Sequence, residues 1–229
     1  MKTKLLMLAV AVVALSFAMP AMATTITYST TGALSCGGNA NCTGGGTSVQ
    51  VASTSGNATV TISFNGLTNQ SVNTAGGPPE TTFGSFGSIV VTCAGTQCGS
   101  NGAGNIPLLT GLGLIINISQ TVPGAGSTAI PVGSISGGIN GSTSSASIAW
   151  LSGTTAPTIT AGGFIVTYAV SNTPLNLTPL TSNTGTTSVQ AAISDTPTGG
   201  TTPEPTSLLL FGSGFLALGL VARARKSRS

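Results

Sequence analysis

The sequence predicts an all-β protein whose central part folds as a single antiparallel β-sandwich, with immunoglobulin-like or jelly-roll-like topology. Apolar and polar residues alternate with a period of two, most clearly over residues 58–64, 110–121 and 164–170. Gly and Asn interrupt these runs at short intervals, and no segment between the two ends has a helical period. Thr, Val and Ile are abundant whereas charged residues make up 4% of the chain, a composition that favours ordered β structure over disorder.

The expected strands follow one another along residues 24–194. An edge strand is expected first, at residues 24–35. Asn65-Gly66 predicts a two-residue hairpin turn between two later strands, and Asn140-Gly141 is a second turn signal. The remaining strands are expected at residues 47–54, 58–64, 67–72, 86–93, 110–121, 130–139, 146–151, 158–170 and 187–193.

Residues 1–23 have the organisation of a signal peptide, whose apolar part is expected to be helical. Two lysines precede a short apolar run, and Ala21 and Ala23 then form a small-x-small cleavage pattern. We therefore expect delivery to the secretion translocon and a cleavage that leaves Thr24 as the first mature residue. An uncleaved anchor helix is the alternative interpretation of the same residues.

Charge is confined almost entirely to the two ends of the chain. All six Lys and Arg residues lie there, and residues 24–202 contain no Lys, Arg or His. A surface without basic side chains cannot neutralise phosphates, so the composition excludes nucleic-acid binding. Because a net charge near zero also removes repulsion between copies, we expect a tendency to self-association.

The residue types that catalysis needs are scarce in the central part. A serine nucleophile needs His or Lys as its base, and residues 24–202 contain neither. Glu80 and Asp195 are the two acids of this stretch, so a glycoside hydrolase that uses this pair is the remaining enzymatic hypothesis. Two acids far apart in the sequence do not make a calcium site either. We expect a non-enzymatic protein without a cofactor or a bound metal.

Four cysteines lie in the central part, and export to an oxidising compartment favours disulfides. Three pairings are open, and proximity in the chain favours Cys36–Cys42 together with Cys93–Cys98, each closing a small Gly-containing loop. The alternative is a tetrathiolate zinc site, although Cys36 and Cys42 are spaced more widely than paired zinc ligands usually are.

Three aromatic residues support a further hypothesis, a carbohydrate-binding module. Trp150, Tyr28 and Tyr168 could supply a platform for a sugar ring, with hydroxyl and amide side chains around it. Trp150 and Tyr168 are also in phase with apolar residues of their expected strands, and this register favours a place in the core. Both interpretations remain open from the sequence.

Residues 203–229 contain three components in a fixed order, after a linker at residues 195–202. Pro203, Glu204 and Pro205 come first. An uncharged apolar run at residues 207–222 follows; as a helix it would be about 24 Å long, which is short for roughly 30 Å of hydrocarbon but sufficient where the bilayer thins. Four basic residues then mark the cytoplasmic side: Arg223, Arg225, Lys226 and Arg228.

This order of parts resembles the PEP-CTERM sorting domain of Gram-negative bacteria. That family ends in a Pro-Glu-Pro motif, a short transmembrane helix and an Arg-rich tail. The resemblance implies recognition by an exosortase, a membrane protease-transpeptidase, with the tail removed or exchanged near the motif, and a host that makes exopolysaccharide. Thr202 departs from the pattern, because the family often has an apolar residue there. An ordinary C-terminal anchor is the alternative interpretation.

Together these features predict an exported, non-enzymatic protein of structural or interaction type, at the cell surface or in the extracellular matrix. We expect transient anchoring in the inner membrane by the C-terminal helix, followed by sorting to an envelope rich in exopolysaccharide. A carbohydrate-binding module delivered by the same route is the second hypothesis. The hydrolase that uses Glu80 and Asp195 is the third.

Overall fold

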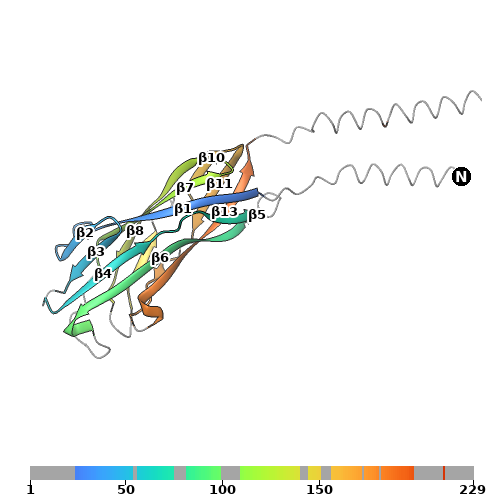
Figure 1. Ribbon diagram of the computed structural model, residues 1–229. Coiled ribbons are helices and arrows are strands. Elements are labelled where there is room, and N and C mark those ends of the chain that lie inside the picture. Colours follow the sequence, from blue (N-terminus) through green and yellow to red (C-terminus); the bar gives the residue numbers. More distant parts are fainter. Residues whose placement is uncertain are drawn as a thin grey trace, which may run out of the picture. The chain divides into compact units, whose positions relative to one another are not determined.

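The computed structural model describes residues 24–53, 56–74, 81–98, 109–139, 144–150, 156–171, 173–180, 182–198 and 214. Within them, thirteen strands and two short 3₁₀ turns are found, and the strands form two antiparallel sheets packed face to face (Figure 1). The predicted all-β sandwich is therefore confirmed. The helices expected at the two ends lie outside the described residues, apart from Gly214. No helix of the described part is long and apolar enough to cross a membrane.

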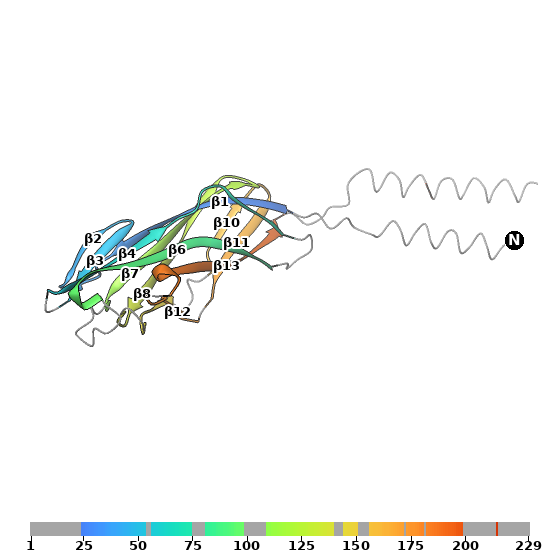
Figure 2. The same ribbon diagram turned by 60° about the horizontal axis from the view of Figure 1, so that its bottom comes forward.

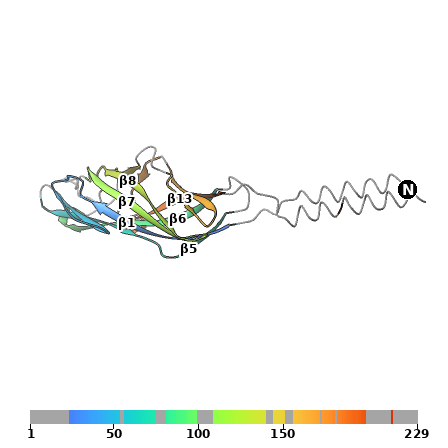
Figure 3. The same cartoon turned by 90° about the horizontal axis from the view of Figure 1, so that it is seen from above.

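One sheet has six strands. Its long strands β1, β7 and β8 lie side by side in the middle of the sheet (Figure 3). Alternate side chains of β1 and β7 are buried, as the period-two pattern predicts. Across the sheet the order is β12 (Leu175–Asn176), β9 (Ser147–Trp150), β8 (Gly126–Ser136), β7 (Leu112–Val122), β1 (Thr24–Ser35) and β5 (Gln70–Thr74).

The other sheet has seven strands, with the 15-residue strand β6 in its middle between β13 and β4 (Figure 2). The two 3₁₀ turns, Thr96–Cys98 and Asn183–Gly185, directly follow β6 and directly precede β13. Across the sheet the order is β10 (Thr158–Ala161), β11 (Phe164–Val170), β13 (Thr186–Pro197), β6 (Thr81–Gly95), β4 (Ala58–Asn65), β3 (Ser48–Ala52) and β2 (Cys42–Gly45).

An aromatic cluster joins the two sheets in the core. Tyr28 comes from β1 of the six-stranded sheet, whereas Phe86 and Tyr168 come from β6 and β11 of the seven-stranded sheet. Their ring centroids are 5.6, 5.8 and 5.9 Å apart in edge-to-face or tilted arrangements, which aromatic pairs prefer. Each side chain is at most 1% exposed. The cluster is thus a fully buried contact between the inner faces.

Polar groups in the core are matched by hydrogen bonds. The Tyr168 hydroxyl donates to Oε1 of Gln120 at 2.7 Å, and Nε2 of the same Gln120 donates to the carbonyl oxygen of Gly124 at 3.0 Å. The Tyr28 hydroxyl donates to the carbonyl oxygen of Ser85 at 2.7 Å. Among the described residues, no buried side-chain nitrogen or oxygen lacks a partner. Buried polar atoms without partners are costly, and this core avoids that cost.

Strand β1 is an interior strand, so the prediction of an edge strand is wrong. One side of β1 pairs with β7. On the other side its first residues pair with β5, the N–H of Thr30 donates to the carbonyl of Leu67 at 2.8 Å, and Leu34 exchanges two backbone hydrogen bonds with Gly46. Leu67 follows β4 and Gly46 lies between β2 and β3, all in the seven-stranded sheet. β1 therefore connects the two sheets through the backbone hydrogen bonds of Thr30 and Leu34, and we call this connection the seam at β1.

The hairpin predicted at Asn65-Gly66 is also wrong. β4 ends at Asn65 in the seven-stranded sheet, whereas β5 begins at Gln70 in the six-stranded sheet, so the connection crosses between the sheets. Gly66 passes so close to β1 that a Cβ there would overlap the carbonyl oxygen of Thr30. The glycine serves a close backbone approach, and a positive φ of 50° is taken instead by Asn69.

The single strand expected at residues 158–170 is two strands, β10 and β11. Gly162 and Gly163 join them with φ angles of 61° and 81°, and two successive positive φ values are typical of a type I′ hairpin turn. The short strands β2 and β12 were not predicted, and β13 continues to Pro197, beyond the domain boundary expected at residue 194. Asn140-Gly141 lies outside the described residues, between bridge partners of an antiparallel pair.

Candidate functional site

The predicted sorting and cleavage residues lie almost entirely outside the described part of the chain. This applies to the Pro-Glu-Pro tripeptide, to Ala21 and Ala23 of the expected cleavage site, and to the basic tail. Thr24, the expected first mature residue, is the first residue of β1. The undescribed residues that the sequence assigns to sorting are Pro203, Glu204, Pro205, Arg223, Arg225, Lys226 and Arg228.

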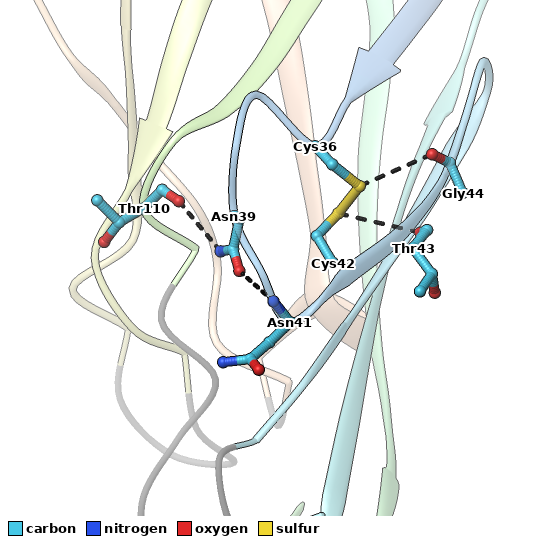
Figure 4. The surroundings of a disulfide bond; sticks show 7 residues. All are labelled: Cys36, Asn39, Asn41, Cys42, Thr43, Gly44 and Thr110. Atoms are coloured by element: carbon cyan, nitrogen blue, oxygen red, sulfur yellow. Dashed lines mark hydrogen bonds between the residues drawn. A yellow bond between two sulfur atoms is a disulfide. The ribbon is translucent and has the colours of Figure 1, made fainter.

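The disulfide Cys36–Cys42 is present, as predicted, at the end of β1 (Figure 4). The two Cα atoms are 5.5 Å apart, a usual separation for a disulfide. The side chain of Asn39 forms two hydrogen bonds. Its Oδ1 accepts one from the N–H of Asn41 at 3.0 Å, within the loop. Its Nδ2 donates the other to the carbonyl oxygen of Thr110 at 3.0 Å. The loop is therefore tied both to itself and to the segment that leads into β7.

The second predicted disulfide, Cys93–Cys98, is present as well. It links β6 to the 3₁₀ turn that follows, with Cα atoms 5.7 Å apart. In both loops one cysteine lies at the end of a strand and the other in the adjacent turn. The two cysteines are therefore brought together by local chain folding and need no contact between distant parts of the sequence. All four sulfur atoms are in disulfides and none is a free thiolate, so the zinc-site alternative is wrong.

The aromatic platform for a sugar is not formed by the residues proposed for it. Tyr28 and Tyr168 are buried in the aromatic cluster, and Trp150 is 9% exposed. Desolvation by burial raises the pKa of Tyr28 to about 12. Burial also raises the pKa of Tyr168, and the charge of a Tyr28 anion raises it further. Tyr28 and Tyr168 therefore fill the core, where a sugar ring has no access to them, whereas Trp150 lines a small surface pocket together with Thr173 and Leu175.

The two acids of the central part are not seen as a pair. Asp195 lies half-buried in β13, and Glu80 lies outside the described residues. Among the residues that the structure describes, no group of three or more His, Cys, Asp or Glu side chains could hold a metal ion. The described part thus brings no second acid to Asp195.

A hollow of about 510 Å³ on the outer face of the six-stranded sheet was not predicted. It lies over β1, β7 and β8, where antiparallel register sets side chains in rows across the strands. One row consists of three serines, because Ser29 pairs with Ser119 and Ser119 with Ser127. The residues that line the hollow are Ser29, Thr31, Asn117, Ile118, Ser119, Ser127, Thr128 and Ala129.

One large apolar side chain is prominent on the outer face of the other sheet. Phe83 of β6 is 75% exposed, and it lies opposite Ala192 of β13. Ile165 of β11 is a smaller exposed apolar side chain in the same sheet. Strand periodicity could have placed Phe83 on an outer face, but residues 81–85 were not recognised as part of the strand.

Residues 201–226 match a family model for a sorting signal, which identifies the chain as an exported protein that is sorted through its C-terminal segment. The model is described as the PEP-CTERM protein-sorting motif. The match confirms the predicted sorting segment, and it implies processing by an exosortase, with export and membrane anchoring before release. The comparisons with curated proteins and with solved structures gave no match.

Proposed function

We propose that the mature protein is a non-enzymatic structural or interaction protein of the cell surface or extracellular matrix, retained there by association with exopolysaccharide. The observation that carries this proposal is the sorting motif at residues 201–226, because such a motif implies export, anchoring and release. The described residues form a β-sandwich with two disulfides, and disulfides are typical of proteins that work outside the cell.

The chemistry of the central part supports a role in binding or assembly rather than in catalysis. Residues 24–202 contain no His, Lys or Arg, so the usual general bases for a serine or threonine nucleophile are missing from this stretch. Solubility depends on hydroxyl and amide side chains, and a near-zero charge leaves little repulsion between copies. A neutral, hydroxyl-rich surface suits a hydrated matrix and is compatible with self-association.

The sorting step is tested by Glu204→Ala in the native host. Glu204 lies outside the apolar run, so we expect the substitution to leave membrane insertion unchanged and to block removal of the tail. Mass spectrometry of the surface-associated protein is the measurement. Thr206→Ala, just beyond the motif, is the matched control and should be processed normally. Intact chains ending at Ser229 in the wild-type surface fraction would contradict the proposal.

Retention is tested by extracting exopolysaccharide from the host and measuring how much mature protein accompanies it. We expect most of the protein in this fraction, and its release into the medium in a strain that makes no polysaccharide. The double substitution Glu80→Gln with Asp195→Asn should leave retention unchanged, since the proposal gives neither acid a role. Equal retention with and without polysaccharide would show that the polymer does not hold the protein.

A further inference from the structure

We propose that the hollow over β1, β7 and β8 is a binding site for a segment of neutral polysaccharide. The inference deepens the proposed function, on which it rests, by naming the surface that meets the polymer. A volume of about 510 Å³ is within the range of ligand sites and is large enough for a short run of sugar units. The hollow faces away from the core, because Ser29, Asn117 and Ser119 of its lining are on the outward side of their strands.

Most polar side chains in the hollow have no hydrogen-bond partner among the described residues. Among the described residues, no hydrogen bond is formed by the side chains of Thr31, Asn117, Ser119 or Ser127. Ser29 is the exception, because its Oγ accepts a hydrogen bond from the N–H of Asn69. These groups therefore present donors and acceptors from three adjacent strands to whatever occupies the hollow.

The same face of β1 outside the hollow behaves differently. The hydroxyl of Thr25 donates to Oδ1 of Asn73 at 2.9 Å, and the hydroxyls of Thr27 and Ser71 are 2.9 Å apart in a mutual hydrogen bond. These two outward hydroxyls of β1 are thus paired with side chains of β5. Inside the hollow, by contrast, the side chains of Asn117, Ser119 and Ser127 remain available to a ligand.

The absence of charge decides the class of ligand. None of the eight lining residues is charged, and the acids of residues 24–202 are Glu80 and Asp195 alone. An anionic polymer would find no cation to pair with, and it would lose hydration on entering the hollow. Hydroxyl and amide groups can both donate to and accept from the hydroxyls of a neutral sugar chain. A neutral polysaccharide is therefore the ligand that the lining fits.

Weak binding at each site is expected. The lining contains no aromatic residue, so hydrogen bonds must provide most of the affinity against competition from water. A dissociation constant of roughly 1 mM per site is typical of so few net contacts. Many protein copies on one polymer chain would convert such sites into firm retention through a high effective concentration.

The test is affinity electrophoresis of the processed protein purified from the host surface. Native gels would contain dextran, hydroxyethyl cellulose or galactomannan as neutral polymers, or alginate as the anionic polymer. The test variant is Asn117→Val with Ser119→Val, which removes one amide and one hydroxyl and keeps strand-forming residues. The matched control is Thr25→Val with Thr27→Val, on the same face outside the hollow.

We expect retardation of the wild type and the control by at least one neutral polymer, at least about five-fold weaker apparent affinity in the test variant, and no retardation by alginate. Equal thermal unfolding of the three proteins will show that the change is local. Retardation by none of the neutral polymers, undiminished retardation of the test variant, or equal retardation by alginate would overturn the proposal.

The outcome can be separated from that of the proposed function. Electrophoresis reports on the hollow alone, whereas tail removal and retention in the host report on sorting and location. Normal processing and polymer-dependent retention together with undiminished binding of the test variant would refute the hollow as the site and leave the proposed function standing. Binding that depends on Asn117 and Ser119, together with retention in the host that is equal with and without polysaccharide, would refute the proposed function and leave the hollow as a binding site.

Discussion

The inner and outer faces of β1 and β7 both carry polar side chains, but the two faces use them differently. Inside, the hydroxyl of Thr30 donates to the carbonyl of Phe86 at 2.8 Å, and Gln120 satisfies the hydroxyl of Tyr168. Outside, Asn117 and Ser119 have no partner among the described residues. A polar group must be matched where water is excluded, whereas it is free to meet a ligand where water has access. Substitutions on the two faces should therefore differ sharply in cost.

The largest effect is expected from Phe86→Ala on the inner face. Phe86 is fully buried and contacts both tyrosines of the aromatic cluster, so its removal leaves a cavity between the sheets. We expect a loss of about 3–5 kcal/mol in the free energy of unfolding. Urea denaturation followed by tryptophan fluorescence is the measurement. A loss below about 1 kcal/mol would show that the sheets close over the gap and do not depend on this ring.

The seam at β1 should be the next most sensitive feature. Gly66→Ala places a methyl group against the carbonyl oxygen of Thr30, so the connection between β4 and β5 must shift. We expect a loss of about 1–3 kcal/mol, typical of overpacking. Gly45→Ala is the matched control, because its new methyl group would lie 3.7 Å from the nearest atom, the carbonyl oxygen of Leu34. Equal urea midpoints for the two variants would disprove the close crossing.

Alkaline pH should weaken the inner face without affecting the outer one. The folded-state pKa of Tyr28 is about 12 against 10.0 for an ordinary tyrosine, so the folded protein keeps a proton that the unfolded chain loses. This contribution to stability is fully present below pH 10 and declines as the pH rises from 10 through 12. The raised pKa of Tyr168 acts in the same direction. Urea unfolding between pH 8 and 11 should show the decline, with a shallower slope in Tyr28→Phe.

The smallest effect is expected on the outer face. Asn117→Val with Ser119→Val removes two polar groups that have no partner within the described part of the protein, and valine suits an exposed strand. The free energy of unfolding should change by less than about 0.5 kcal/mol. A loss above about 1 kcal/mol in the free energy of unfolding would mean that these side chains stabilise the fold. Polar groups on the inner and outer faces would then not differ in their importance for stability.

The sequence predicted those features that depend only on residues close together in the chain. Alternation located β4 and β7, because half-buried strands need apolar residues at every second position. Cysteine spacing and the expected compartment located both disulfides, because each closes a short loop. The sorting segment was recognisable because its three parts are contiguous in the chain.

Features that depend on which strands are neighbours could not be predicted. Asn65-Gly66 has the composition of a hairpin turn, but the choice between a turn and a crossing depends on where Thr30 lies. The serine row of the hollow joins Ser29 to Ser119 and Ser127, and only the register of three strands brings these residues together. The hairpin at Gly162-Gly163 is different, because two adjacent glycines are themselves a local signal for such a turn.

The seam at β1 has a consequence for the order of events during export. A chain that crosses a membrane from its N-terminus delivers β1 first, yet every partner of β1 comes later: Gly46, Leu67, β5 and finally β7. The pairing of Thr27 with Val122 is the most distant of these in sequence. The opening strand consequently stays without its full set of neighbours until more than half of the polypeptide has emerged. A chain delivered in this order would therefore complete the pairing of β1 only after β7 has crossed the membrane.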